Sequence, residues 1–140
     1  MTVPEFVDLS LTALAWSEAD QVSYAELISP DQKKLYVDLD TLDAVELLRL
    51  AKHTPGNDRV FQVLVDLLLT NGYVPEALFL SISPRGELTC RLLYQKKNLP
   101  GFLELRPGDG LVLAVLMNLP VRAHTSLLMS FVDRDRTTVG

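Results

Sequence analysis

Cysteine and histidine are nearly absent from this chain of 140 residues. The single cysteine, Cys90, cannot form a disulfide within the chain and is expected to be a small core residue. The two histidines, His53 and His124, lie too far apart in sequence for the ligand spacing of a zinc site. The composition therefore argues against a disulfide-rich scaffold and a zinc module. The chain is long enough to bury a core as one domain without either.

Positive charge is also in short supply. Thirteen Lys and Arg residues stand against eighteen Asp and Glu, for a net charge of -5 at pH 7. Tight, sequence-independent binding of nucleic acid draws on clustered Lys and Arg, so this balance argues against it. Lysines gather in two pairs, Lys33 with Lys34 and Lys96 with Lys97, each ahead of an expected strand. Turn lysines are usually solvated, but these four are the candidate contacts for a nucleic acid substrate.

Long hydrophobic runs and targeting segments are missing as well. The apolar helix expected over residues 111–117 is much shorter than the roughly 20 residues that span a bilayer. No signal peptide is visible, so we expect a cytoplasmic protein that does not enter a membrane. Apolar residues nevertheless make up 48% of the chain, and its mean hydropathy is +0.18. Such an excess in a short chain predicts a stable homo-oligomer.

The hydropathy pattern predicts one α+β domain over residues 1–132 and a frayed tail over 133–140. Alternating apolar residues predict strands, and apolar residues three and four apart predict helices. The expected strands are 3–16, 21–28, 35–39, 73–83, 87–95, 99–105 and 121–123. The expected helices are 41–51, 58–71, 107–118 and 125–132. The second of these carries its polar residues in one narrow stripe, which predicts burial of most of its circumference.

The two halves of the chain resemble each other. A shift of 71 residues aligns two Val-Pro-Glu segments, and a shift of 66 places Asp43 on Asp109. This self-similarity predicts an internal duplication of a β-β-β-α unit, with halves at 3–51 and 74–117 bridged by the helix at 58–71. One unit alone would leave its apolar helix face bare, so we expect the sheets to pack on central helices.

The most specific motif is Arg106-Pro107-Gly108-Asp109, a turn that runs into an apolar helix and is followed by Pro120 and a short strand. It resembles the hallmark of the bifunctional nuclease domain family, whose usual wording is Arg-Pro-Ser-Asp-Ala. The segment 35–47 is similar to the family's strand leading into an acidic, Ala-rich helix. The resemblance covers residues 3–131. Where the family usually carries Arg-Pro-x-Thr-His-Asp, this chain has Phe61 and Gln62 in place of the His-Asp pair.

The resemblance implies metal-assisted hydrolysis of DNA or RNA phosphodiesters. Arg106 would contact phosphate, and Asp109 would serve as a catalytic base or a metal ligand. Asp43 would be a second ligand of the divalent ion, magnesium or manganese. The residues alone also allow a plainer role for both acids, because an acid in the first turn of a helix is favoured by the macrodipole and can cap the helix start.

Two other functions stay open from the sequence. The acidic charge and the missing His-Asp pair favour a non-catalytic, oligomeric binding or regulatory module of the same fold. A small-molecule-binding protein with a pocket between the repeats is the third alternative. The surface around Arg106 separates the first two readings. A basic cleft there would favour the nuclease, and an acidic or apolar surface would favour the module.

Overall fold

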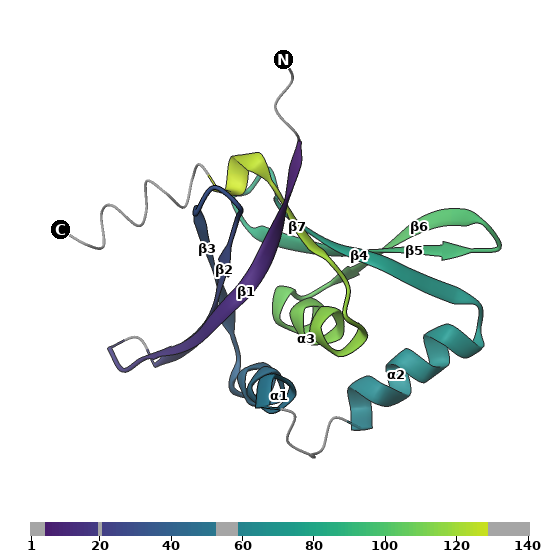
Figure 1. Ribbon diagram of the computed structural model, residues 1–140, viewed down its shortest axis with the longest axis horizontal. Coiled ribbons are helices and arrows are strands. Elements are labelled where there is room, and N and C mark those ends of the chain that lie inside the picture. The colour runs from purple at the N-terminus through teal and green to yellow at the C-terminus, as the bar shows by residue number, and fades with distance from the viewer. Residues whose placement is uncertain (1–4, 20, 53–58, 129–140) are drawn as a thin grey trace.

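A computed structural model describes residues 5–19, 21–52 and 59–128 of the chain (Figure 1). The strands are β1 (Phe6–Ser17), β2 (Val22–Ile28), β3 (Lys34–Leu39), β4 (Tyr73–Ile82), β5 (Leu88–Lys96), β6 (Leu99–Leu105) and β7 (Val121–His124). The helices are α1 (Thr41–Lys52), α2 (Arg59–Thr70) and α3 (Pro107–Met117), and residues 125–128 are helical as well. The α+β class expected from the sequence is confirmed.

The strands form one mixed sheet of seven, in the order β3-β2-β1-β7-β4-β5-β6. Neighbouring strands run antiparallel except β4 and β7, which are parallel. We expected more than one sheet. The structure has a single sheet because β7 lies between the two three-stranded meanders, with Ala123 opposite Val7 of β1 and Leu80 of β4.

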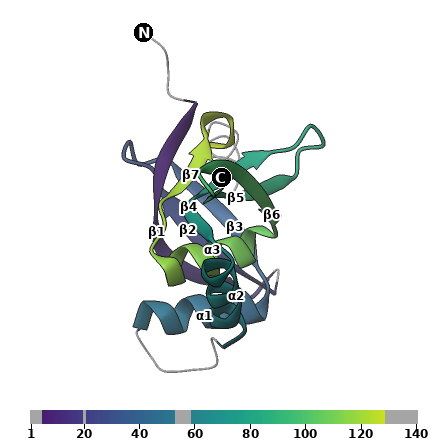
Figure 2. The same cartoon turned by 90° about the vertical axis from the view of Figure 1, so that its right-hand side faces the viewer.

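The sheet curves around α3, with β1, β2 and β3 on one side and β4, β5 and β6 on the other (Figure 1). On the open side of this curve lie α1 and α2 (Figure 2). Helix α3 contacts both of them and also β3, β4 and β5. Its segment Leu111–Ala114 is buried, which confirms the prediction of a core helix. It ends at Asn118, whose left-handed backbone and amide bond to Val115 form the predicted C-terminal stop.

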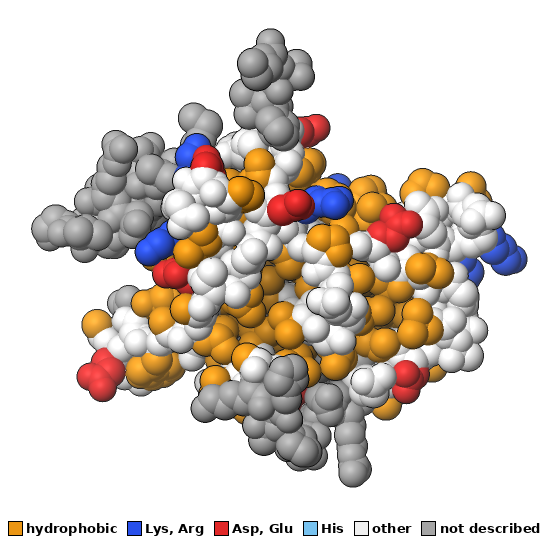
Figure 3. Space-filling model, in the orientation of Figure 1, with side chains coloured by type: hydrophobic (Ala, Val, Ile, Leu, Met, Phe, Trp, Pro, Cys, Tyr) orange, Lys and Arg blue, Asp and Glu red, His pale blue; other side chains and the backbone are white. Residues whose placement is uncertain are grey.

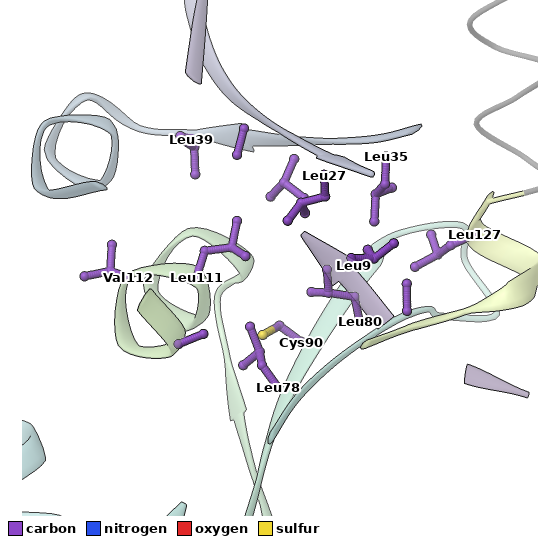
Figure 4. Close-up of a cluster of buried hydrophobic side chains, with 14 of the residues drawn as sticks. Leu9, Leu27, Leu35, Leu39, Leu78, Leu80, Cys90, Leu111, Val112 and Leu127 are labelled. Atoms are coloured by element: carbon purple, nitrogen blue, oxygen red, sulfur yellow. The ribbon is translucent and has the colours of Figure 1, made fainter. Parts of the chain in front are cut away.

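Leucines from both halves of the curved sheet and from α3 make up the core (Figure 4). Leu27 of β2 and Leu35 of β3 come from one half, and Leu78 and Leu80 of β4 come from the other half. Cys90 is buried among them, as predicted for a small core residue. Burial raises the pKa of its thiol to about 12, with the nearby charge of Asp109 as a second cause. Among the described residues, no helix is long and apolar enough to cross a membrane. A cytoplasmic location stays a prediction.

The two outer helices differ from their expected burial. Glu46, a charged residue of α1 that would ordinarily face solvent, is buried together with Asp43 and Leu47. These three positions share one face of the helix, and the opposite face is exposed although it is apolar. Over residues 62–70, the part of α2 whose side chains the structure describes, the expected burial of most of the circumference is wrong, because Val65 is the one buried residue there. The exposed large apolar residues of the two helices are Leu42, Val45, Leu48, Val63, Leu67 and Leu69.

Candidate functional site

Two strand-to-helix junctions meet on the open side of the sheet. The first is Asp40, between β3 and α1, and the second is Arg106, between β6 and α3. Asp40 caps α1, because its Oδ1 accepts a hydrogen bond of 2.9 Å from the amide of Asp43. Arg106 is the N-cap residue of α3 with an extended backbone and no capping side-chain bond, and Pro107 starts the helix. Both side chains are therefore placed by the ends of their strands.

Arg106 forms ion pairs with the carboxylates of Asp40, Asp43 and Asp109, and we call these four residues the Arg106 cluster. Its Nη2 donates to Oδ2 of Asp40 at 2.5 Å and to Oδ2 of Asp43 at 3.1 Å. Its Nε lies 3.5 Å from Oδ2 of Asp109. The structure thus brings together the three residues that the sequence nominated as catalytic or metal-binding, and adds Asp40.

Asp43 is the buried member of the cluster, with 3% of its surface exposed. Its carboxylate packs on Gly108, where an added Cβ would overlap Oδ2. The pKa of Asp43 is raised to about 6, first by burial and then by the charges of Asp109 and Asp40, against the opposing effect of Arg106. The pKa of Asp40 is lowered, first by the hydrogen bond from the amide of Asp43 and then by Arg106. The pKa values of Asp40 and Asp43 are therefore shifted in opposite directions.

Asp43 lies in the first turn of α1, where the helix dipole favours its charge, but its side chain does not cap the helix. The cap of α1 is Asp40, and the carboxylate of Asp43 instead faces Arg106. Asp109 lies in the first turn of α3, where the helix dipole favours its charge. Gly108 and Gly110 are both buried and permit close packing, and the amide of Gly110 donates to the carbonyl of Arg106 at 2.9 Å.

The four candidate lysines lie elsewhere. Lys33 forms an ion pair of 3.6 Å with Asp31, and Lys34 lies 3.9 Å from Glu26. The ammonium of Lys96 lies 4.4 Å from the centre of the Tyr73 ring.

Lys97 is exposed in the turn between β5 and β6. Lys34 begins the strand that ends beside Asp40, and Lys97 precedes the strand that ends beside Arg106. The rise of a strand puts about 20 Å between each lysine pair and the Arg106 cluster. The structure does not bring the lysines to the candidate site.

The donor set of the Arg106 cluster is a poor match for a divalent ion. Among the described residues, no group of three His, Cys, Asp or Glu is arranged to hold a metal ion. Asp43 and Asp109 both lie against the guanidinium of Arg106, which already supplies the positive charge they need. An ion would have to displace Arg106 from both carboxylates. Binding of magnesium or manganese stays a prediction.

Sequence reasoning missed two features of this region. The sequence analysis does not include Asp40 in the site, although the Asp-x-x-Asp spacing of residues 40 and 43 places both acids at one helix start. Glu46 forms a close ion pair with Arg49, and Glu46 Oε2 and Arg49 Nε are buried without a hydrogen-bond partner among the described residues. No pattern in the sequence separates this buried pair from an ordinary exposed one.

A scan against models of protein families finds no match to this chain, and a search of curated proteins finds none either. The resemblance to the bifunctional nuclease domain family therefore rests on the Arg106-Pro107-Gly108-Asp109 turn and the pattern of elements around it.

Proposed function

We propose that this chain is a non-catalytic, oligomeric binding module of the bifunctional nuclease domain type. The observation that carries the proposal is the engagement of Arg106 by Asp40, Asp43 and Asp109. One cation faces three carboxylates, so the surface at the helix starts is acidic. A phosphodiester would meet repulsion there, because the guanidinium that should bind it is already neutralised.

Support also comes from the apolar surface. Hydrophobic side chains run across the middle of the face seen in Figure 3, with most of its charged groups near the margins. Leu42 on α1 is 77% exposed, and Val63 and Leu67 on α2 are each more than half exposed. Exposed apolar side chains in such number favour an interaction surface. Self-association would cover it without requiring any other partner.

The rotation of α1 about its own axis also supports an oligomer. Asp43 and Glu46 lie on its buried side, whereas Leu42, Val45 and Leu48 lie on its exposed side. The ion pair with Arg106 holds the helix in this rotation, since Asp43 must face α3. A helix with its leucines outward is unfavourable for an isolated monomer and favourable beneath a partner surface.

We further propose the internal duplication predicted from the sequence. The halves share the element order strand, strand, strand, helix, as β1-β2-β3-α1 and β4-β5-β6-α3. In each half the third strand runs directly into the helix, and Asp43 and Asp109 occupy the third helical residue of their halves. A pseudo-two-fold relation should superpose residues 5–51 on 74–117. Failure of those backbones to superpose would end this part of the proposal.

The nuclease interpretation keeps one observation in its favour. A buried Asp43 with a pKa near neutrality beside a more exposed Asp109 is an arrangement suited to acid–base chemistry. In that case Asp109 would accept the proton of the attacking water, and Arg106 would have to release the carboxylates to bind phosphate. A divalent ion, when bound, would polarise the phosphoryl group.

One experiment separates the two functions. Single-stranded DNA and RNA are incubated with the full chain and with magnesium or manganese, alongside Asp109→Asn as the matched variant. The module predicts no hydrolysis above the level of Asp109→Asn, and sedimentation equilibrium at micromolar concentration shows a dimer or larger species. Hydrolysis that Asp109→Asn abolishes while keeping its melting temperature would establish the nuclease. A monomeric, inactive protein would reject both.

A further inference from the structure

Strand β6 is one free edge of the sheet, and its apolar side chains are exposed on both faces. It extends with β5 as a hairpin away from α3, above α2 in the view of Figure 1. Leu99 is 70% exposed and Phe102 is 55% exposed, and Leu103 is exposed as well. Glu104 is the one charged side chain of the strand. An exposed apolar edge of this kind is a template for pairing with another strand.

The opposite edge, β3, offers an internal comparison. Its Leu35, Val37 and Leu39 are buried, and its outward residues include Lys34 and Asp38. This edge therefore carries the charged side chains that natural sheets use to discourage pairing, and no apolar residue on it is exposed. The chain protects one edge of its sheet and leaves the other apolar.

The backbone of β6 shows which groups are open for pairing. Pro100 has no N–H, so it cannot donate to Gln95, its neighbour on β5, and its backbone faces the free edge. Residues of an antiparallel strand alternate in direction, so Phe102 and Glu104 present their N–H and C=O groups to the same free edge. The free side thus offers two donors and three acceptors.

The side chains of β6 divide between two faces of the sheet. Leu103 and Leu105 are opposite the buried residues Leu92 and Cys90, so the odd-numbered residues share the core side. Phe102 lies on the other side, with its ring 6.2 Å from that of Phe79. A strand added at this edge could therefore contact apolar side chains of β6 on both faces of the sheet.

We propose that β6 pairs antiparallel with β6 of a second copy of this chain, about a two-fold axis at Phe102; this rests on the proposed oligomeric function. Centring on Phe102 overlaps all seven residues of the strand. Each Phe102 then lies directly opposite Phe102 of the second copy, and the two residues exchange both backbone hydrogen bonds. At either end of the pairing, the backbone N–H of Glu104 donates to the carbonyl of Pro100 in the other copy. Pro100 has no N–H of its own that would lack an acceptor.

The occupant is a second copy because the edge is self-complementary in this register. Leu99 lies opposite Leu105, and Leu103 lies opposite Gly101, whose missing side chain leaves room for it. The two Phe102 rings form a cross-strand aromatic pair on the other face. In a two-fold contact, each residue faces either the same residue or the symmetry-related partner in the second copy, and the two must fit together. Every residue of β6 meets that condition in this register.

Disulfide formation tests the register. Phe102→Cys places two thiols in a directly opposed pair, within the Cα separation that a disulfide accepts. Leu99→Cys is the matched control, since that position is more exposed but lies about 20 Å from its mate in this register. The native Cys90 is buried and does not compete. Under mild oxidation of the full chain, we expect a covalent dimer from Phe102→Cys and none from Leu99→Cys.

Sedimentation equilibrium tests the interface. Phe102→Lys opposes two like charges and should raise the dimer dissociation constant more than about tenfold. Trp16→Lys is the control, because it removes another exposed aromatic residue on β1. A wild type that self-associates, with Phe102→Lys no weaker than Trp16→Lys and no cross-link through residue 102, would overturn this inference and leave the proposed function standing. A monomeric wild type would overturn both.

Discussion

Nη2 of Arg106 lies 3.1 Å from Oδ2 of Asp43, a residue 63 positions earlier in the chain. The contact joins the start of α1 to the start of α3, and therefore one half of the chain to the other. Asp43 is buried and Arg106 is largely exposed, so the carboxylate depends on a partner that water also reaches. Several expected outcomes depend on this asymmetry.

Replacement of Arg106 by methionine should lower the free energy of unfolding more than the loss of an ordinary surface ion pair does. It leaves Asp43 buried beside Asp40 and Asp109 without a counter-charge, although exposure of the guanidinium keeps the loss below that of a fully buried pair. Urea denaturation measures the change. Arg91→Met, which breaks the exposed pair with Glu104, serves as the control and should cost under about 1 kcal/mol. Equal losses in the two variants would contradict the structural role of Arg106.

The stability of the wild type should fall relative to Asp43→Asn as pH rises from 4 to 6.5. Asp43 has a folded pKa of about 6 against an ordinary value of 3.8, so the folded state keeps a proton that the unfolded chain releases. The difference is at most about 3 kcal/mol over this range. Asp40 should act in the opposite sense, because its pKa is lowered and its contribution is lost as pH falls below 4. Parallel pH curves for wild type and Asp43→Asn would refute the assignment.

Gly110→Ala should destabilise the fold by about 1–3 kcal/mol, since the added methyl would overlap the sulfur of Cys90 and approach Leu78. Cys90→Ala alone should also cost stability, because it removes the sulfur from a packed core. The double variant should be more stable than the two single losses predict, since Cys90→Ala removes the sulfur that the new methyl would overlap and the methyl fills part of the space left. Additive losses in thermal unfolding would mean that these residues are not in contact.

The thiol of Cys90 should resist labelling in the native protein at pH 8 and react once the chain is unfolded. Its burial and its pKa of about 12 both remove the thiolate that reacts. Labelling with a chromogenic disulfide reagent, with and without guanidinium chloride, gives the measurement. Rapid labelling of the folded protein would show that this part of the core opens readily.

Most of the elements could be predicted from the sequence because their signals are local. The alternation of β5 and β6, the apolar run of α3 and the left-handed stop at Asn118 are set by neighbouring residues. The place of Asp43 and Asp109 at equivalent positions near two helix starts also follows from the sequence. These are properties that a few adjacent residues determine.

The rest could not be predicted, because it depends on how distant segments meet. The rotation of α1, which buries Glu46 and exposes Leu42, follows from the contact between Asp43 and Arg106. The insertion of β7 between β1 and β4 depends on two strands far away in sequence. The distance of the lysine pairs from Arg106 follows from strand direction and not from residue type.

The position of β7 also sets an order on folding during synthesis. Its partners are β1 and β4, both made much earlier, and it is the last described strand to leave the ribosome. Until residues 121–124 emerge, β1 and β4 each have one unpaired side, and the nascent chain holds two separate meanders. The sheet can become continuous only after residues 121–124 have emerged. Truncation before residue 121 should therefore yield two unjoined units that aggregate during translation.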